Sequence, residues 1–243
     1  MFKISIVMSY KDRLDLLRNT LFSVLDGTRP DEIIIVDDAS DEPLSIVNVS
    51  DFMQDLNIKI VSISKKEKTW VNPCIPFNRG FKEASGDIII IQNPESYHKG
   101  DIVKHVAKIK ETDYFSYSCY SLDENSTYNN FRIKDKGAII DGDDAWYNHP
   151  VHRPVGYHFC SAITKKNLDE LGGFDERYAQ RIGFDDNEFL TRIKKRGLRV
   201  KIIDNPFVLH QWHYDKIHYD SSIESNADLF RRTMNETSWK VNA

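Results

Sequence analysis

The chain has 243 residues, of which 40% are hydrophobic and 29% charged, and its formal net charge is −4. This size and composition predict one globular domain with a full hydrophobic core, and the slightly acidic balance gives no electrostatic basis for binding nucleic acid. No apolar stretch approaches the roughly 20 residues of a transmembrane segment and no signal peptide is recognisable, so we expect a soluble, cytoplasmic protein. Its three cysteines lack metal-ligand spacing and are expected to be reduced thiols.

Two strand-like runs near the N-terminus flank a helical segment. Lys3–Met8 and Ile33–Val36 are apolar and β-rich, and apolar residues repeat at helical spacing over Leu14–Leu25. This βαβ pattern predicts a parallel sheet with a ligand crevice at the carboxyl ends of its strands, Ser9–Arg13 and Asp37–Ser40. Because no Gly-x-Gly-x-x-Gly follows the first strand, a dinucleotide site of the Rossmann type is disfavoured and a nucleotide would be held by side chains.

The next elements continue an alternation of strands and helices. Strands are predicted at Asn57–Ser64 and Asp87–Ile91, the second apolar throughout and therefore central. The polar run Lys65–Thr69 between them is predicted to be a solvated loop. Trp70–Gly86 leads into a helix that carries Asn78.

A long irregular segment follows a helix predicted at Asp101–Lys110 and a strand predicted at Tyr114–Tyr120. Ser121–Pro154 is polar, and a loop of that length in a domain is often functional or mobile. Its aromatic and imidazole groups, Trp146 foremost, could pack against sugar rings or merely anchor a surface insert. Gly156–Thr164 is expected to be a strand that enters the site.

The clearest helix signals lie in the stretch after a Gly-Gly turn. Asp185 and Glu188 have the spacing of a capping box, which predicts Asp185 as the N-cap. Asp186 falls on the same helical face as Phe189 and Ile193, so its carboxylate is directed inward at the positive end of the helix dipole. A carboxylate so placed suits a general base, although both acids could instead only cap the helix.

Two histidines follow a strand predicted at Leu198–Ile202 and a short run at Pro206–Val208. His210 and His213 could be two metal ligands, one ligand with a structural partner, or two packed imidazoles. The chain then becomes polar, with a helix predicted at Ile223–Met234 and a loose tail after it.

Several of these motifs resemble family 2 glycosyltransferases with the GT-A fold. GGFDERY and the Gly-Phe-Asp-Asp-x-Glu-Phe helix are similar to the acceptor side of galactosyl- and chondroitin-type transferases, and SIVMSYKDRLDLL and EIIIVDDAS resemble the opening strand and the Asp-Asp of strand two. The resemblance implies an α/β single domain with a mostly parallel central sheet flanked by helices. We expect a nucleotide-sugar half at about 1–110, an acceptor half at about 111–213, and a helix and tail at 214–243.

The resemblance also implies a reaction, the inverting transfer of a sugar from a nucleotide diphosphate sugar to a hydroxyl of a glycan or glycoconjugate, with UDP as the expected nucleotide. Asp186 matches the catalytic base and Asp185 its acceptor-binding neighbour, with Trp146 and Gly173 also on the acceptor side. Asp38 matches the acid that contacts the base of the nucleotide. The other residues expected to face the nucleotide sugar are Ser9, Tyr10, Lys11, Arg13, Asn78 and Asn93.

The family normally has Asp-x-Asp after the fourth strand, two acids that hold a divalent cation on the diphosphate. Here Asn93 and Glu95 occupy those positions, which leaves one carboxylate. We expect Mn²⁺ or Mg²⁺ to be held mainly by the donor's phosphates, with Glu95 and one of the two histidines, His210 or His213, assisting, or with His98 in that role. The literal match, Asp141-Gly142-Asp143, lies in a loop-like stretch and is a poor replacement.

The alternative is a non-catalytic module that binds a sugar nucleotide or glycan, having kept the fold and lost the metal acids. The intact Asp186 argues against this alternative, and the altered Asn93 argues for it.

Overall fold

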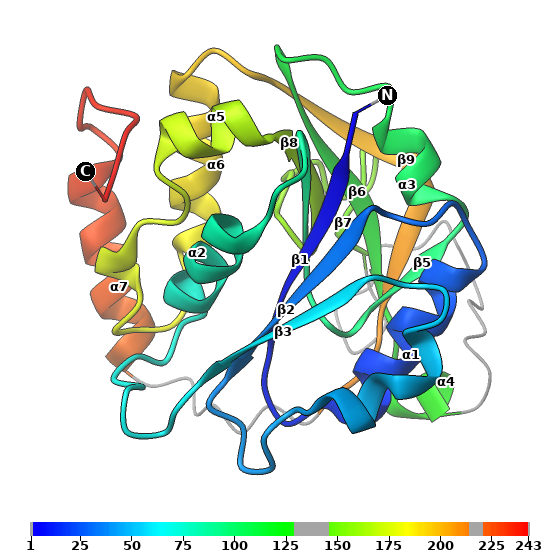
Figure 1. Cartoon of the computed structure of the whole chain (residues 1–243). Helices are drawn as coiled ribbons and strands as arrows, with labels where there is room; N and C mark the ends of the chain where they lie inside the picture. The colour runs from blue at the N-terminus through cyan, green and yellow to red at the C-terminus, as the bar shows by residue number, and fades with distance from the viewer. Residues whose placement is uncertain (1, 129–145, 214–220, 243) are drawn as a thin grey trace.

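The computed structural model describes residues 2–128, 146–213 and 221–242, and its nine described strands form one sheet with helices on both faces (Figure 1). The sheet order is β3-β2-β1-β4-β8-β6-β9-β5, and β7 pairs with β6 outside this path. The strands are β1 (Ile4–Tyr10), β2 (Glu32–Asp38), β3 (Ile58–Ile63), β4 (Ile88–Gln92), β5 (Ser96–Lys99), β6 (Asp113–Ser121), β7 (Trp146–Asn148), β8 (Cys160–Thr164) and β9 (Arg199–His210).

Helices cover the two faces in two groups that can be followed in Figure 1. Those on one face are α1 (Leu14–Leu25), the 3₁₀ helix η1 (Ile46–Phe52) and α3 (Ile102–Val106). Those on the other are α2 (Cys74–Glu83), α5 (Lys165–Leu171), the 3₁₀ helix η2 (Glu176–Tyr178) and α6 (Asp185–Lys195), with α7 (Ser221–Thr233) packed against α6. The short α4 (Glu124–Tyr128) follows β6. Among the described residues, no helix combines the length and apolar character needed to cross a bilayer.

The half of the sheet that holds β1 to β4 is parallel, as predicted. The isoleucines from Ile88 to Ile91 are buried, as expected of a central strand covered on both faces. In the other half β8 is antiparallel to β4 and β6, although β6 and β9 are parallel. The α/β class and single domain are therefore confirmed, but the sheet is mixed rather than mostly parallel. A buried strand has the same apolar pattern in either direction, so the sequence could not give this orientation.

The C-terminal half also corrects several element boundaries. β9 is one strand of 12 residues through Pro206, where the sequence predicted two separate pieces. The register of β9 with β6 shifts between Tyr117 and Cys119. Such an interruption of the strand pairing accommodates Pro206, which has no N–H to donate. The tail is not loose in its described part, because Val241 N–H donates to Leu171 O at 3.1 Å and Asn242 Nδ2 donates to Gly172 O at 2.9 Å.

Candidate active site

A cavity of about 800 Å³ lies where the segments after β1, β2, β4 and β9 meet. The ends of β1 and β2 are side by side, as the βαβ pattern predicts: Lys11 Nζ donates to Ala39 O at 3.0 Å, and Asp12 N–H donates to Ser40 Oγ at 3.1 Å. Of the predicted nucleotide-side residues, those that line the cavity are Ser9, Lys11, Arg13, Asp38 and Asn93.

Asp38 lies at one part of this cavity with two donors on its carboxylate. Trp70 Nε1 donates to Oδ1 at 2.9 Å, and Lys68 Nζ pairs with Oδ2. Burial raises the pKa of Asp38, and Lys68 and Trp70 offset only part of that rise. The solvated-loop prediction for Lys65–Thr69 is therefore wrong at Lys68, which lines the cavity because its partner is buried below it. By contrast, Asp37 closes the turn predicted after β2, accepting from Ser40 N–H at 3.1 Å.

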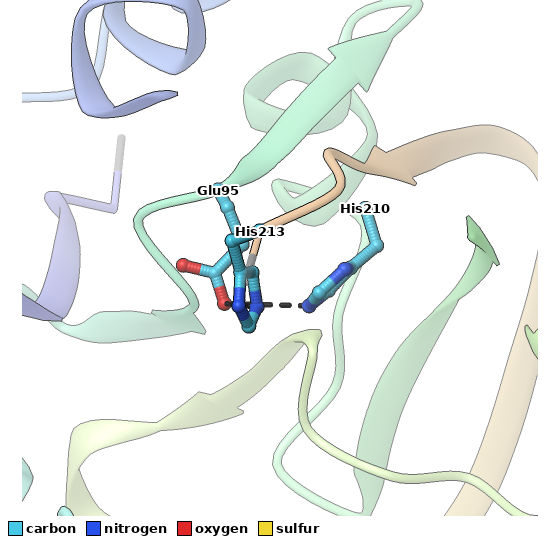
Figure 2. Close-up of side chains that lie close together, drawn as sticks. All are labelled: Glu95, His210 and His213. Atoms are coloured by element: carbon cyan, nitrogen blue, oxygen red, sulfur yellow. Dashed lines mark ion pairs between the residues drawn. The ribbon is translucent and has the colours of Figure 1, made fainter. Parts of the chain in front are cut away.

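Glu95 lies at another part of the cavity, between β4 and β5, with two imidazoles from the end of β9 (Figure 2). Oε1 is 3.3 Å from His210 Nε2 and 3.6 Å from His213 Nε2, while Oε2 is 3.3 Å from Arg13 Nη1. Burial alone would raise the pKa of Glu95, but the His210 contact and the Arg13 charge hold it well below its usual range. The antiparallel pairing of β5 with β9, which sets Ser96 opposite His210, brings the acid and the imidazoles together.

These three side chains fit a divalent cation. The carboxylate and both imidazoles each offer a ligand atom, all within 4.8 Å of one another. Glu95 Oε1 is the carboxylate oxygen nearest both imidazoles, so it is the one that would share a cation with them. One carboxylate and two imidazoles favour a transition metal such as Mn²⁺ over Mg²⁺, which prefers oxygen ligands.

Two other metal-ligand expectations have different outcomes. His98 is not a ligand: it is buried on the core side of β5, where its Nε2 is 2.9 Å from Gln92 Oε1 and burial lowers its pKa to about 4. Successive strand residues face opposite sides, which the sequence proximity of His98 to Glu95 did not reveal. Asp141 to Asp143 lie outside the described residues.

The two acids of α6 have separate partners. Asp185 accepts from Asn72 Nδ2 at 2.8 Å, and Asp186 Oδ1 accepts from His158 N–H at 3.2 Å and lies 2.5 Å from His158 Nδ1. Burial and the neighbouring Asp186 charge raise the pKa of Asp185. For Asp186, burial acts upward, but the His158 charge and the contacts of His158 with the carboxylate outweigh it and lower the pKa.

Neither acid is among the residues that line the cavity, but Asp186 lies next to its wall. Its side chain is 27% exposed, and the ring of its partner His158 packs edge-on against Phe77, a lining residue, with centroids 5.7 Å apart. His158, Asp185 and Asp186 could also group around an ion. We treat His158 and Asp186 as a direct pair, because two ligands of one ion lie about 3 Å or more apart.

The capping-box prediction at this helix is wrong. Asp185 is the first helical residue, and the N-cap position is Phe184, with a left-handed φ of 64° and no side-chain cap. Glu188 pairs with Arg192 instead of reaching back, with Arg192 Nε 2.5 Å from Oε1. The left-handed residue after Gly183 displaces the start of the helix by one position.

Two predicted nucleotide-side residues lie away from the cavity. Tyr10 is 3% exposed and belongs to the core between the sheet and α1, because it is the last residue of β1 and faces that helix. Asn78 is buried on α2, where its Nδ2 donates to Phe174 O at 2.8 Å and its Oδ1 accepts from Phe174 N–H at 2.8 Å. This amide joins α2 to the Gly-Gly-Phe-Asp turn. Neither Tyr10 nor Asn78 therefore belongs to the nucleotide site.

Two predicted acceptor residues are likewise structural. Trp146 is 3% exposed and packs edge-on against Tyr120 at 4.8 Å, because β7 turns this ring from the polar segment into the core. Gly173 has a φ of +73°, and a Cβ there would lie 2.3 Å from Asn78 Oδ1. Close approach to α2 therefore explains this glycine without an acceptor.

Other cavity residues carried no signal strong enough to be singled out. Trp212 and Tyr128 line the cavity with ring centroids 6.5 Å apart, and Tyr128 is 63% exposed. Trp212 lies within the His-x-x-His motif, whose spacing indicates a role only for the two histidines. Phe77 could not be distinguished from a core residue of α2.

The sheet and its strand-end cavity have the arrangement of the GT-A fold, and the family match gives the class of this protein as a glycosyltransferase. The chain belongs to Glycosyl transferase family 2, whose family model matches residues 5–172. A curated relative, the O-antigen biosynthesis protein RfbC of Myxococcus xanthus, is 24% identical over an alignment 234 residues long, which covers 86% of this chain and 17% of that protein.

Solved structures support the same fold. TarS 1-349 of S. aureus in complex with UDP-GlcNAc matches with a TM-score of 0.65 and 14% identity, over 88% of this chain and 60% of that one. The mannosyltransferase PcManGT of Pyrobaculum calidifontis, in complex with GDP-Man and Mn²⁺, matches with a TM-score of 0.60 and 18% identity, over 96% and 61%. The chain thus spans about three fifths of these structures and about a sixth of the curated relative.

Proposed function

We propose that this chain transfers a sugar from a UDP-sugar to a hydroxyl of a glycan or glycoconjugate, with inversion at the anomeric carbon. The observation that carries the proposal is one cavity of about 800 Å³ lined by both the Asp38–Lys68 pair and the Glu95–His213 pair. That volume lies within the usual range for small-ligand sites. One pair would bind the base of the nucleotide and the other a cation. These are the two ends of a nucleotide diphosphate, and both pairs line the same cavity.

The nucleotide base is the part that Asp38 and Lys68 would recognise. A carboxylate acceptor beside an ammonium donor is complementary to the N3–H and O4 of uracil. A carboxylate offers about four lone-pair sites, so the bonds to Trp70 and Lys68 leave capacity for the uracil N–H. The UDP complex of TarS is compatible with this assignment.

The leaving diphosphate requires positive charge. Glu95, His210 and His213 would hold Mn²⁺ beside it, and the bound cation supplies charge stabilisation to the phosphate oxygens. Arg13 and Lys11 line the same cavity and would contribute donors from the protein itself. Asn93, the residue in place of an acid, also lines the cavity and can donate to a phosphate oxygen.

Asp186 is the proposed base. Its carboxylate takes the proton of the acceptor hydroxyl as the acceptor oxygen bonds to the anomeric carbon, and the bond from that carbon to the diphosphate oxygen breaks with its electrons on the diphosphate. Attack opposite the leaving group inverts the anomeric carbon. The likeness to the O-antigen biosynthesis protein of M. xanthus favours a polysaccharide acceptor. The two imidazoles beside Glu95 weaken the case for a non-catalytic module, because they compensate for the missing acid.

The test is a thermal-shift screen of UDP-glucose, UDP-galactose, UDP-N-acetylglucosamine and GDP-mannose, each with Mn²⁺ and with EDTA. A ligand that binds only the native state raises the melting temperature. We expect a UDP-sugar to do so with Mn²⁺, and Asp38→Ala to remove the shift. The matched control is Asp51→Ala, an exposed acid that pairs with Arg18 on the surface. A shift by GDP-mannose alone would contradict the assignment of UDP.

A further inference from the structure

His158, in the segment before β8, has a buried imidazole in contact with the proposed base. Its Nδ1 lies 2.5 Å from Asp186 Oδ1, and its backbone N–H donates to the same oxygen at 3.2 Å. The ring packs against Phe77 and Phe174, with centroids 5.7 and 4.6 Å away. The imidazole therefore meets the carboxylate inside an aromatic pocket, where an ionic contact is weakly screened.

The distance requires a proton between the two groups, since a bare nitrogen lone pair would repel a carboxylate oxygen. The raised pKa of His158 and the lowered pKa of Asp186 place that proton on Nδ1. The contact is poorly aligned for a hydrogen bond, so attraction between charges dominates it. Both contacts from His158 go to Oδ1. Within the described parts of the chain no group donates a hydrogen bond to Oδ2, and the side chain is 27% exposed. One oxygen is thus held by His158, while the other accepts no hydrogen bond from the described residues.

Other ionisable groups around the pair come from several elements. Asp185 on α6 and Arg153, before β8, carry charge that acts on it, with Asp185 stabilising the imidazolium and Arg153 the carboxylate. Tyr114 on β6 and Cys74 on α2 face the two acids, and burial raises the pKa of both, so they stay neutral. Burial acts against the imidazolium, but the charge of Asp186 outweighs it and raises the pKa of His158.

We propose that His158 is a positioning residue, and this proposal rests on the proposed role of Asp186 as the base. The imidazolium of His158 keeps the carboxylate of Asp186 ionised through Oδ1 and leaves Oδ2 to take the proton of the acceptor hydroxyl. A carboxyl in an apolar pocket without such a partner has a raised pKa, because burial disfavours its charged form. The pair therefore keeps the base ionised under mildly acidic conditions that would protonate an unpaired carboxyl.

The first test needs no substrate. Histidine Cε1 and aspartate Cγ resonances of the whole chain are titrated by NMR in the parent, Asp186→Asn, Asp185→Asn and His158→Phe. We expect His158 to titrate above 6.5 in the parent and at least about one unit lower in Asp186→Asn, with a smaller change in the matched control Asp185→Asn. In His158→Phe, whose ring suits the aromatic pocket, Asp186 should titrate about two units higher. If His158→Phe fails to fold, the His158 titration in Asp186→Asn decides alone.

The second test asks whether the pair matters to turnover. UDP release from the donor found by the screen is measured from pH 5 to 9 for the parent, His158→Phe, His158→Gln and His105→Phe, a control in a histidine on the opposite face. We expect the acid limb to rise by about two pH units in His158→Phe, less in His158→Gln, and not in His105→Phe. An unchanged acid limb alongside a raised Asp186 titration would overturn the proposal, as would a parent His158 that titrates at or below 6.5. Failure of the proposed function would appear separately, as full activity in Asp186→Asn.

Discussion

Replacement of Glu95 by glutamine should uncouple the donor from the metal. Glu95 is 2% exposed, and its negative charge is opposed by Arg13 at 3.3 Å, with His210 and His213 at 3.3 and 3.6 Å. The charge of Arg13 offsets that of Glu95, so the cluster attracts a cation weakly until a diphosphate adds negative charge. Metal and donor should then bind with positive coupling, each strengthening the other by the same factor.

Glutamine keeps the shape of Glu95 but removes the only carboxylate of the cluster. The loss of one charged ligand is worth about 1.5–3 kcal/mol, which corresponds to a roughly ten- to 150-fold weaker UDP affinity in Mn²⁺. Calorimetric titration of UDP into the parent and Glu95→Gln, each with Mn²⁺ and with EDTA, measures this coupling. The exposed Glu42→Gln serves as the control. If UDP affinity is equal in all four titrations, no metal acts at Glu95, and Arg13 with Lys11 must stabilise the diphosphate.

The other predictions concern the base, the nucleotide and pH. Asp186→Asn should reduce transfer by about 10²–10⁴-fold while leaving UDP binding intact, and parental activity in a transfer assay would disprove its role. Asp38→Ala should weaken UDP binding by roughly 1.5–3 kcal/mol; calorimetry that gives parental affinity would move the base pocket elsewhere. The raised pKa of His158 contributes to the free energy of unfolding in full below pH 6.5, and this contribution is lost as pH rises through the pKa of the folded state. The lowered pKa of Asp186 contributes above pH 3.8, and this contribution is lost as pH falls through the pKa of the folded state. Urea unfolding should therefore show Asp186→Asn destabilised more at pH 6 than at pH 9, and an equal loss at both would contradict the pairing.

The strand-end part of the site was predictable because topology alone determines it. Parallel strands joined by a crossover helix end at the same edge, so the segments after β1 and β2 had to meet. Asp38 and Arg13 line the cavity for that reason. The helix of Asp186 was equally clear from its periodicity, although the left-handed Phe184 moved its first residue.

The errors arose where a side chain's direction depends on contacts distant in the sequence. Trp146 sits in a polar stretch but is buried by its pairing with β6, and Asn78 faces the Phe174 turn, 96 residues away, rather than the cavity. Lys68 lies in a charged run, the usual composition of a solvated loop. Only the buried Asp38, 30 residues earlier, explains its place in the site.

The sequence showed only the spacing of His210 and His213, and their place in the structure depends on Gln211, one of the two residues between them. Gln211 is fully buried, its backbone N–H donates to Glu95 O at 3.0 Å, and its Nε2 donates to Leu16 O at 3.1 Å. Its Oε1 accepts from Asn19 Nδ2 at 2.9 Å. A buried amide with these partners cannot rotate without leaving polar groups unpaired, which costs about 1–3 kcal/mol for each group. The end of β9 is thereby fixed to both α1 and the backbone of Glu95, so the acid and the imidazoles are aligned before any ligand arrives.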